Sequence, residues 1–208
     1  MISHEFGFVF VHVPFNGSES LSEDYLKHNG EYVISSFDVE NLPWDTPLEG
    51  ENLGSFVKQF PEHELFAMVK SPYLRAVEMW IEAQSKLRIA GIGRLTLGNY
   101  YENLLNMWKC APDDKIDRQV DYLRSTDGEY YGVDVDFKVT TLFKYENLVD
   151  GEMADINEFL SELGTSNVNY YYDSSILKNW EDHYDDHAIE MVNYIFEEDF
   201  SFCGYHKL

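Results

Sequence analysis

Residues 6–13, which read FGFVFVHV, decide the class of fold. They form an almost unbroken run of apolar, aromatic and β-branched side chains, which is typical of a central strand buried on both faces. Pro14 ends the run, and a polar segment of small residues follows it. We therefore expect a buried strand, a tight loop and then a short helix over residues 21–28.

Strands and helices alternate along the rest of the chain. β-Branched and aromatic residues predict further strands over residues 31–37, 65–69 and 137–145. Apolar residues at helical spacing predict helices over residues 72–89, 99–108, 119–123, 155–163 and 185–197. The alternation predicts an α/β fold with a mainly parallel central sheet flanked by helices. No repeat or linker divides the sequence, so we expect a single domain over residues 1–208.

The charge balance limits the partners of the protein. The 208 residues include 38 acidic and 15 basic side chains, which gives a formal net charge of −23. Because clusters of Lys and Arg bind phosphate backbones and anionic lipids, we expect neither a nucleic-acid nor a membrane partner. The chain has no apolar run near the roughly 20 residues of a transmembrane helix and no secretory signal pattern, so we expect a soluble, cytoplasmic protein.

The loop after the first strand is a candidate site, because ligands of parallel α/β sheets bind at the carboxyl ends of strands. The patterns GxxxxGK[ST] and GxGxxG are absent, but backbone N–H groups at a helix start and two serine hydroxyls favour an anion. The alternative is a plain turn that leads into a helix. The loop consists of Pro14, Phe15, Asn16, Gly17, Ser18, Glu19 and Ser20.

A second candidate is the junction between the predicted strand at 65–69 and the predicted helix at 72–89. Lys70 and Arg75 bracket this junction. Because the chain has only 15 basic residues, two of them at a strand end and a helix start suggest an anion clamp. The alternative is a solvated lysine and an arginine that pairs with a nearby acid.

Three other features give weaker indications. His183 and His187 have the i, i+4 spacing of metal ligands, but Tyr184 stands where a zincin has its glutamate, and we predict no metal site. Cys110 and Cys203 form neither a disulfide framework nor a metal-ligand pattern, and we interpret both as ordinary thiols. No local Ser/His/Asp or Cys/His motif supports a hydrolase.

Taken in order, these segments resemble the sulfotransferases that use 3′-phosphoadenosine 5′-phosphosulfate (PAPS), specifically the carbohydrate sulfotransferase-like branch. The family's apolar strand followed by HVPKTGGTS is similar to FVFVHVPFNGSES at 8–20, and its RDPYERLVS is similar to KSPYLRAVE at 70–78. The family's Gln-x-x-Tyr-Leu pattern is similar to residues 119–123. The family also has a strand that ends in a YENL signature, and residues 145–148 of this chain read YENL. The C-terminal Tyr-x-x-Asp-Phe pattern of the family is similar to residues 195–205. Their order and spacing hold across nearly the whole chain.

The resemblance implies a P-loop-type three-layer fold and a function. A sulfotransferase-like protein would transfer a sulfuryl group from PAPS, its co-substrate, to a hydroxyl acceptor such as a small molecule or glycan, without a metal. By resemblance, residues 14–20 would hold the 5′-phosphosulfate. Lys70, Arg75 and the position of Glu78 would bind the 3′-phosphate. Asp45 stands near the spacing of the family's general base, and His12 and His63 are the alternatives.

Several residues depart from the family pattern. Phe15 stands at the lysine that neutralises the leaving phosphate, and Glu78 stands at the serine that would bind the 3′-phosphate. Glu19 replaces a threonine, and Lys70 replaces an arginine and so loses its bidentate fork. A catalytically degenerate sulfotransferase fold that serves as a binding or interaction module is therefore the competing hypothesis. The missing Walker lysine argues against a third, a P-loop kinase or nucleotide hydrolase.

The sequence leaves other points open. Arg75 and Lys115 are both candidates for the positive charge that Phe15 lacks. A net charge of −23 favours a neutral acceptor over an anionic one, and it predicts that PAPS binding strengthens as salt screens the field of the protein. The identity of the acceptor and the oligomeric state do not follow from the sequence.

Overall fold

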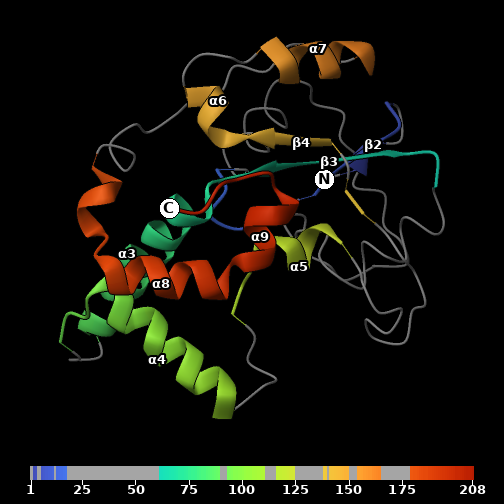
Figure 1. The fold of residues 1–208 in the computed structure, drawn as a ribbon. Coiled ribbons are helices and arrows are strands. Elements are labelled where there is room, and N and C mark those ends of the chain that lie inside the picture. Colours follow the sequence, from blue (N-terminus) through green and yellow to red (C-terminus); the bar gives the residue numbers. More distant parts are fainter. Residues whose placement is uncertain are drawn as a thin grey trace. The chain divides into compact units, whose positions relative to one another are not determined.

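In the computed structural model, the apolar run at residues 6–13 contains strand β2 (Phe8–Val11), whose four side chains are all buried (Figure 1). β2 lies next to β3 (Glu64–Val69), β3 lies next to β4 (Thr141–Lys144), and the three strands are parallel. The short strand β1 (Ile2–Ser3) pairs antiparallel with β2. The prediction of an α/β fold, with a mainly parallel sheet flanked by helices, is confirmed.

The structure describes the sheet and the helices around it. The predicted helix at 21–28 and the predicted strand at 31–37 lie outside the described residues. The described residues are 2–3, 6–11, 13–17, 61–89, 93–110, 116–124, 138–139, 141–149, 154–164 and 179–208.

The chain forms two compact units. The first comprises Met1–Val69 and Asp121–Tyr172 and contains the sheet. The second comprises Lys70–Val120 and Asp173–Leu208, and its described elements are helices. The boundary falls at the carboxyl end of β3, so the two candidate segments belong to different units. A single domain over the whole chain stays a prediction.

Aromatic side chains hold a helix of the first unit against the sheet. The ring centroid of Phe66 on β3 lies 5.1 Å from that of Phe10 on β2, and 5.1 Å from that of Phe159 on α7 (Ala154–Glu162). Phe143 on β4 lies 5.4 Å from Phe159. α7 therefore covers one face of the sheet, and the apolar area removed from water stabilises it by about 25 cal/mol per Å².

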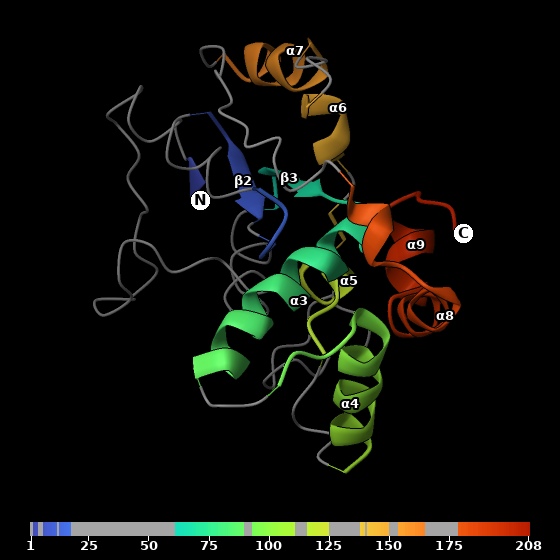
Figure 2. The same cartoon turned by 90° about the vertical axis from the view of Figure 1, so that its left-hand side faces the viewer.

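The described core of the second unit lies between helices from both ends of its sequence. Figures 1 and 2 both show α8 next to α3 and α4. Among the most deeply buried side chains are Tyr101, Val192 and Phe196. α3 has the predicted bounds, and its proline stands at the first position, where the missing N–H costs nothing. The helices are α3 (Pro72–Ile89), α4 (Leu97–Cys110), α5 (Gln119–Leu123), which spans the boundary, η1 (Trp180–His183), α8 (Asp186–Ile195) and α9 (Glu197–Phe202).

In two places a further helix begins at the last residue of a predicted element. The predicted helix at 185–197 is wrong in its extent: α8 ends at Ile195, Phe196 leaves the helical conformation, and three acids in the first turn of α9 stabilise a new helix N-terminus. The predicted strand at 137–145 is shorter, because β4 ends at Lys144 and α6 (Tyr145–Val149) begins with the YENL signature. The signature is therefore the start of a helix.

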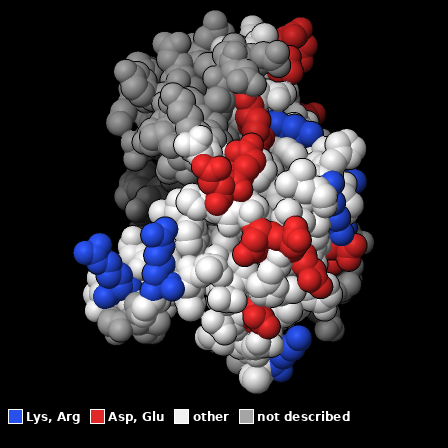
Figure 3. Space-filling model, turned by 60° about the vertical axis from the view of Figure 1, so that its left-hand side comes forward, with Lys and Arg blue, Asp and Glu red and all other residues white. Residues whose placement is uncertain are grey.

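The surface of the described residues carries mainly acidic charge. Figure 3 shows several patches of Asp and Glu side chains on the described face, with Lys and Arg in small groups and other residues over most of the face. None of the helices in the described part has the length and apolarity that a bilayer-spanning helix needs.

Gly98 marks a close approach of α4 to α8. A Cβ at this position would lie 2.6 Å from Cδ2 of His187 and 3.1 Å from the backbone nitrogen of Ala188. We expect Gly98→Ala to lower the free energy of unfolding by about 1–3 kcal/mol, because the backbone of α8 has to move. Urea denaturation measures the change. Gly93→Ala is the control, since its Cβ would meet nothing within 4 Å, and equal effects of the two variants would contradict this packing.

Candidate functional site

The loop after β2 is a tight turn at the carboxyl end of a central strand. Residues 14–17 form the turn, and the N–H of Asn16 donates to the C=O of Val13 (3.3 Å). The side chain of Asn16 is fully buried, and its Nδ2 donates to the C=O of Met68 on β3 (2.8 Å). This bond ties the loop of one strand to the carboxyl end of the neighbouring strand.

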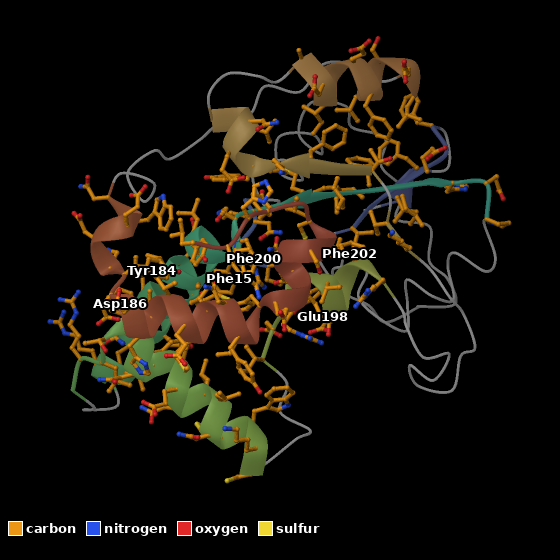
Figure 4. All side chains as sticks on the ribbon, in the orientation of Figure 1. Phe15, Tyr184, Asp186, Glu198, Phe200 and Phe202 are labelled. Atoms are coloured by element: carbon orange, nitrogen blue, oxygen red, sulfur yellow. The ribbon has the colours of Figure 1, made fainter. Side chains whose placement is uncertain are left out.

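The backbone of this turn alternates in handedness. Phe15, labelled in Figure 4, has a φ of +65°, and Gly17 has a φ of +72°, whereas Asn16 between them is not in the positive-φ region. Alternating signs of φ occur in nests, in which successive N–H groups point toward one concavity that favours an anion, but here the N–H of Asn16 donates to the C=O of Val13. A left-handed conformation costs a residue with a Cβ about 1–2 kcal/mol. The fold therefore holds Phe15 in a strained conformation at the predicted anion loop.

The structure describes only part of the set of residues that the sequence singled out. In the first loop, Pro14, Phe15, Asn16 and Gly17 are described. His63, an alternative base, is mostly buried, and its Nδ1 lies 3.6 Å from a carboxylate oxygen of Glu62. The residues outside the described part of the chain are Ser18, Glu19, Ser20, Asp45, His12 and Lys115.

Both predicted cations of the second segment are buried. Lys70 is 2% exposed and Arg75 is 1% exposed. Nζ of Lys70 lies 2.7 Å from Oε2 of Glu78, which is itself largely buried. Nη1 of Arg75 donates to the C=O of Asp117 (2.7 Å). The glutamate that stands at the family's serine is therefore the ion-pair partner of the lysine that stands at the family's arginine.

A chain of hydrogen bonds fixes the backbone of Lys70. Oε1 of the buried Gln119 accepts from the N–H of Lys70 (2.9 Å), and its Nε2 donates to the C=O of Lys70 (2.8 Å). The two carboxylate oxygens of Asp199 accept from the N–H groups of Gln119 (2.9 Å) and Val120 (2.8 Å). Because these two residues begin α5, Asp199 satisfies two of the N–H groups that lack a partner within that helix and complements its dipole.

Gln119 and Asp199 belong to two of the motifs in the sequence, but the pattern predicts no role for either residue. The two residues lie 80 positions apart in the sequence. The spacing of side chains within one helix or strand cannot predict a contact between residues so far apart. Charged residues directly precede both Gln119 and Asp199, so local polarity did not mark either one as a buried polar side chain in need of a partner.

Asp199→Asn tests this network. One carboxylate oxygen becomes an NH₂ group, so one buried N–H of Gln119 or Val120 loses its acceptor and faces a second donor. We expect the free energy of unfolding to fall by about 2 kcal/mol in urea denaturation. The control is Glu198→Gln, because Glu198 is exposed and pairs with Arg118 (3.2 Å), and this pair is worth less than about 1 kcal/mol. Equal losses would contradict the network.

Buried tyrosines surround the start of α3. The ring of Tyr73 lies 4.9 Å from that of Phe200, and the hydroxyl of Tyr184 donates to the C=O of Tyr73 (2.7 Å); Tyr184 and Phe200 are labelled in Figure 4. The hydroxyl of Tyr101 donates to the C=O of Ala76 (3.0 Å). Burial raises the pKa of both Tyr184 and Tyr101 above the ordinary value of a tyrosine, which favours the protonated form of both hydroxyls.

The histidine pair of the sequence has other contacts. The ring of His183 lies 5.2 Å from that of Trp80, and Nε2 of His187 lies 3.5 Å from a carboxylate oxygen of Glu102. Within the described ranges, no group of three or more His, Cys, Asp or Glu side chains is placed to bind a metal ion. Cys110 is exposed and Cys203 is buried, and both are free thiols.

Comparison with known proteins finds no match among family models, curated proteins or solved structures. The case for a function therefore depends on the motifs of the chain and on the geometry of the two segments.

Proposed function

We propose that the chain is a sulfotransferase-like protein that binds PAPS and transfers its sulfuryl group to a hydroxyl acceptor such as a saccharide. The turn after β2 is the observation that supports this most. Phe15 has a strained φ of +65° at the carboxyl end of a parallel strand, at the motif position of the 5′-phosphosulfate. Strained backbone is concentrated at ligand-binding sites, and ligands of such sheets bind at this edge.

The turn would also provide the local positive site that an anionic ligand needs in such an acidic chain. A chain with a net charge of −23 repels an anionic nucleotide at long range, so binding needs a local positive site. Backbone N–H groups supply partial positive charge without a basic side chain. The N–H of Phe15 and the start of the helix predicted after the turn would serve this purpose, and the buried bond from Asn16 to Met68 would keep the turn in place before the nucleotide binds.

In this proposal the protein contributes positioning and electrostatics. The acceptor oxygen, the sulfur and the leaving phosphate oxygen have to lie in line, as in phosphoryl transfer. A bond forms from the acceptor oxygen to sulfur as the bond from sulfur to the phosphate oxygen breaks, and a base takes the hydroxyl proton. The N–H groups of the turn would stabilise the charge that develops on the leaving phosphate. Asp45 remains the predicted base.

A catalytically degenerate fold that serves as a binding or interaction module is the second candidate, and the Lys70–Glu78 pair favours it. Lys70 is almost fully buried, and its ammonium group already has a carboxylate partner at 2.7 Å. Arg75 is equally buried and donates to a backbone carbonyl. The two cations that a 3′-phosphate would use are thus engaged within the protein itself.

A transfer assay separates the two candidates. The protein is incubated with PAPS and a panel of neutral disaccharides, and adenosine 3′,5′-bisphosphate and sulfated sugar are measured by chromatography and mass spectrometry. We expect slow release of the bisphosphate that depends on the acceptor and matches the sulfated sugar mole for mole. Binding of the nucleotide without transfer to any acceptor would favour the binding module.

Two glycine variants test whether the turn is responsible. Gly17→Ala and Gly7→Ala each place a Cβ at a positive φ, +72° and +66°, so each costs about 1 kcal/mol of stability. Only Gly17 belongs to the turn after β2. We expect Gly17→Ala to reduce transfer and Gly7→Ala to leave it unchanged, and equal effects would mean that the turn does not hold the phosphosulfate.

A further inference from the structure

A pocket of about 340 Å³ lies beside the C-terminal half of α3, within the second unit. Small-molecule sites typically have volumes of about 300–1,000 Å³. Gln84 and Arg88 on α3 come 9 and 13 residues after Arg75, which is about 14–20 Å along the helix at about 1.5 Å per residue. The pocket is therefore separate from the Lys70–Arg75 segment. Its lining residues are Trp80, Ile81, Gln84, Ser85, Arg88 and Arg94.

The described residues of the lining carry positive charge and include no carboxylate. Arg88 and Arg94 both line the pocket, and neither forms an ion pair with a described residue. Lys86 on the same helix, in contrast, pairs with Glu82 (2.5 Å). In a chain with 38 acidic and 15 basic side chains, two arginines that share a pocket without an acidic partner in the described part form a locally positive site.

Gln84 adds a neutral donor to the two arginines. Its Oε1 accepts from the N–H of Leu95 (3.3 Å), and this bond sets the orientation of the amide. Its Nε2 is buried and has no hydrogen-bond acceptor among the described residues. A buried donor without an acceptor is unfavourable, and an oxygen atom of a ligand in the pocket would satisfy it.

Contacts within the second unit hold residues of the pocket in place before a ligand binds. The C=O of Leu95 accepts from Nε1 of Trp80 (3.1 Å), so side chains of α3 hold both backbone groups of Leu95. Cζ of the neighbouring Arg94 lies 5.6 Å from the centre of the Trp80 ring, which is the geometry of a cation–π contact. A site that is ordered before binding loses less conformational entropy when a ligand arrives.

We propose that this pocket binds a small organic oxyanion, with a phosphate, sulfate or carboxylate group held by Arg88, Arg94 and the amide of Gln84. The planar guanidinium group binds such oxyanions through two parallel hydrogen bonds. Ile81 also lines the pocket and is 41% exposed, so it offers a surface for an apolar part of the ligand. This site does not depend on the proposed sulfotransferase activity.

Calorimetric titration at constant ionic strength tests the proposal. The probes are phenyl phosphate, phenyl sulfate, benzoate and inorganic phosphate. We expect at least one of the three phenyl compounds to bind with a millimolar or lower Kd, and the order among them identifies the oxyanion. Phenyl phosphate should bind more tightly than inorganic phosphate, because its ring covers the apolar surface of Ile81.

Two double variants distinguish binding at this pocket from a general effect of the net charge of the protein on affinity. Arg88→Gln with Arg94→Gln should weaken the tightest probe by about tenfold or more, because it removes both charged donors. Lys86→Gln with Lys109→Gln removes the same charge from exposed lysines outside the pocket and should leave the affinity nearly unchanged. Circular dichroism verifies that both variants fold, as expected for exposed positions.

Two results would overturn the proposal. One is equal weakening by the two double variants, which would assign the binding to net charge. The other is the absence of binding heat for all four probes at about 20 mM, well above the millimolar Kd that the two arginines should provide.

A third variant, Gln84→Glu, should weaken binding as strongly as the double arginine variant does. It replaces the amide donor of Gln84 with a carboxylate, which would repel the ligand.

Discussion

Glu78→Gln will lower the free energy of unfolding by about 3–5 kcal/mol, because it removes the carboxylate charge that faces the buried ammonium group of Lys70. Lys70 is 2% exposed, and its Nζ lies 2.7 Å from Oε2 of Glu78. Few single substitutions have an effect this large, and an uncompensated buried charge is one of the mechanisms that produce it. Urea denaturation followed by circular dichroism measures the change.

Glu82→Gln is the matched control for this result. Glu82 belongs to the same helix and also pairs with a lysine, Lys86, but both side chains of that pair are exposed. We expect the control to change stability by less than about 1 kcal/mol. The double variant Lys70→Met with Glu78→Leu should recover most of the loss, since apolar side chains often replace a buried ion pair without cost. Similar losses for Glu78→Gln and Glu82→Gln would contradict the buried pair.

Phe15→Lys should raise the rate of sulfuryl transfer by about 10²–10³-fold. The prediction follows from the proposed function: an ammonium group in the turn after β2 would stabilise the charge on the leaving phosphate, and one such donor is worth about 2.7–4 kcal/mol of the barrier. The φ of +65° is no less favourable for lysine than for phenylalanine, so the fold should persist. Single-turnover kinetics with PAPS measure the rate.

Phe15→Met is the control for the lysine variant. It replaces the aromatic ring with another uncharged side chain, so the rate of transfer should stay close to that of the unmodified protein. If Phe15→Lys folds and also leaves the rate unchanged, the leaving phosphate does not lie at this turn, and the interaction module becomes the better account of the chain.

Local sequence patterns predicted those helices and strands whose first and last residues are determined by side chains within the element itself. The apolar run at residues 6–13 predicted β2, since a continuous apolar run is typical of a strand that is buried on both faces. The proline at position 72 and the apolar spacing after it predicted both ends of α3. Phe196 escaped prediction because its apolar character continues the pattern of α8, whereas the end of that helix depends on where Phe196 packs.

The residues of the candidate site were predicted, but their partners were not. Glu78 was interpreted as a charge that repels a phosphate, and the structure shows it as the partner of Lys70, which precedes α3. Gln119 and Asp199 are joined across 80 positions of sequence. Pairings of this kind depend on the packing of whole elements, and the pattern within one element does not contain that information.

Calorimetric titration with adenosine 3′,5′-bisphosphate, the desulfated product of PAPS, measures whether the chain binds the nucleotide of a sulfotransferase. The titration uses the Arg88→Gln, Arg94→Gln protein, so that binding to the pocket beside α3 does not contribute. We expect one nucleotide to bind per chain, with an affinity that rises as salt screens the net charge of −23 and that falls in Gly17→Ala. The absence of binding heat at millimolar nucleotide would contradict the proposed function.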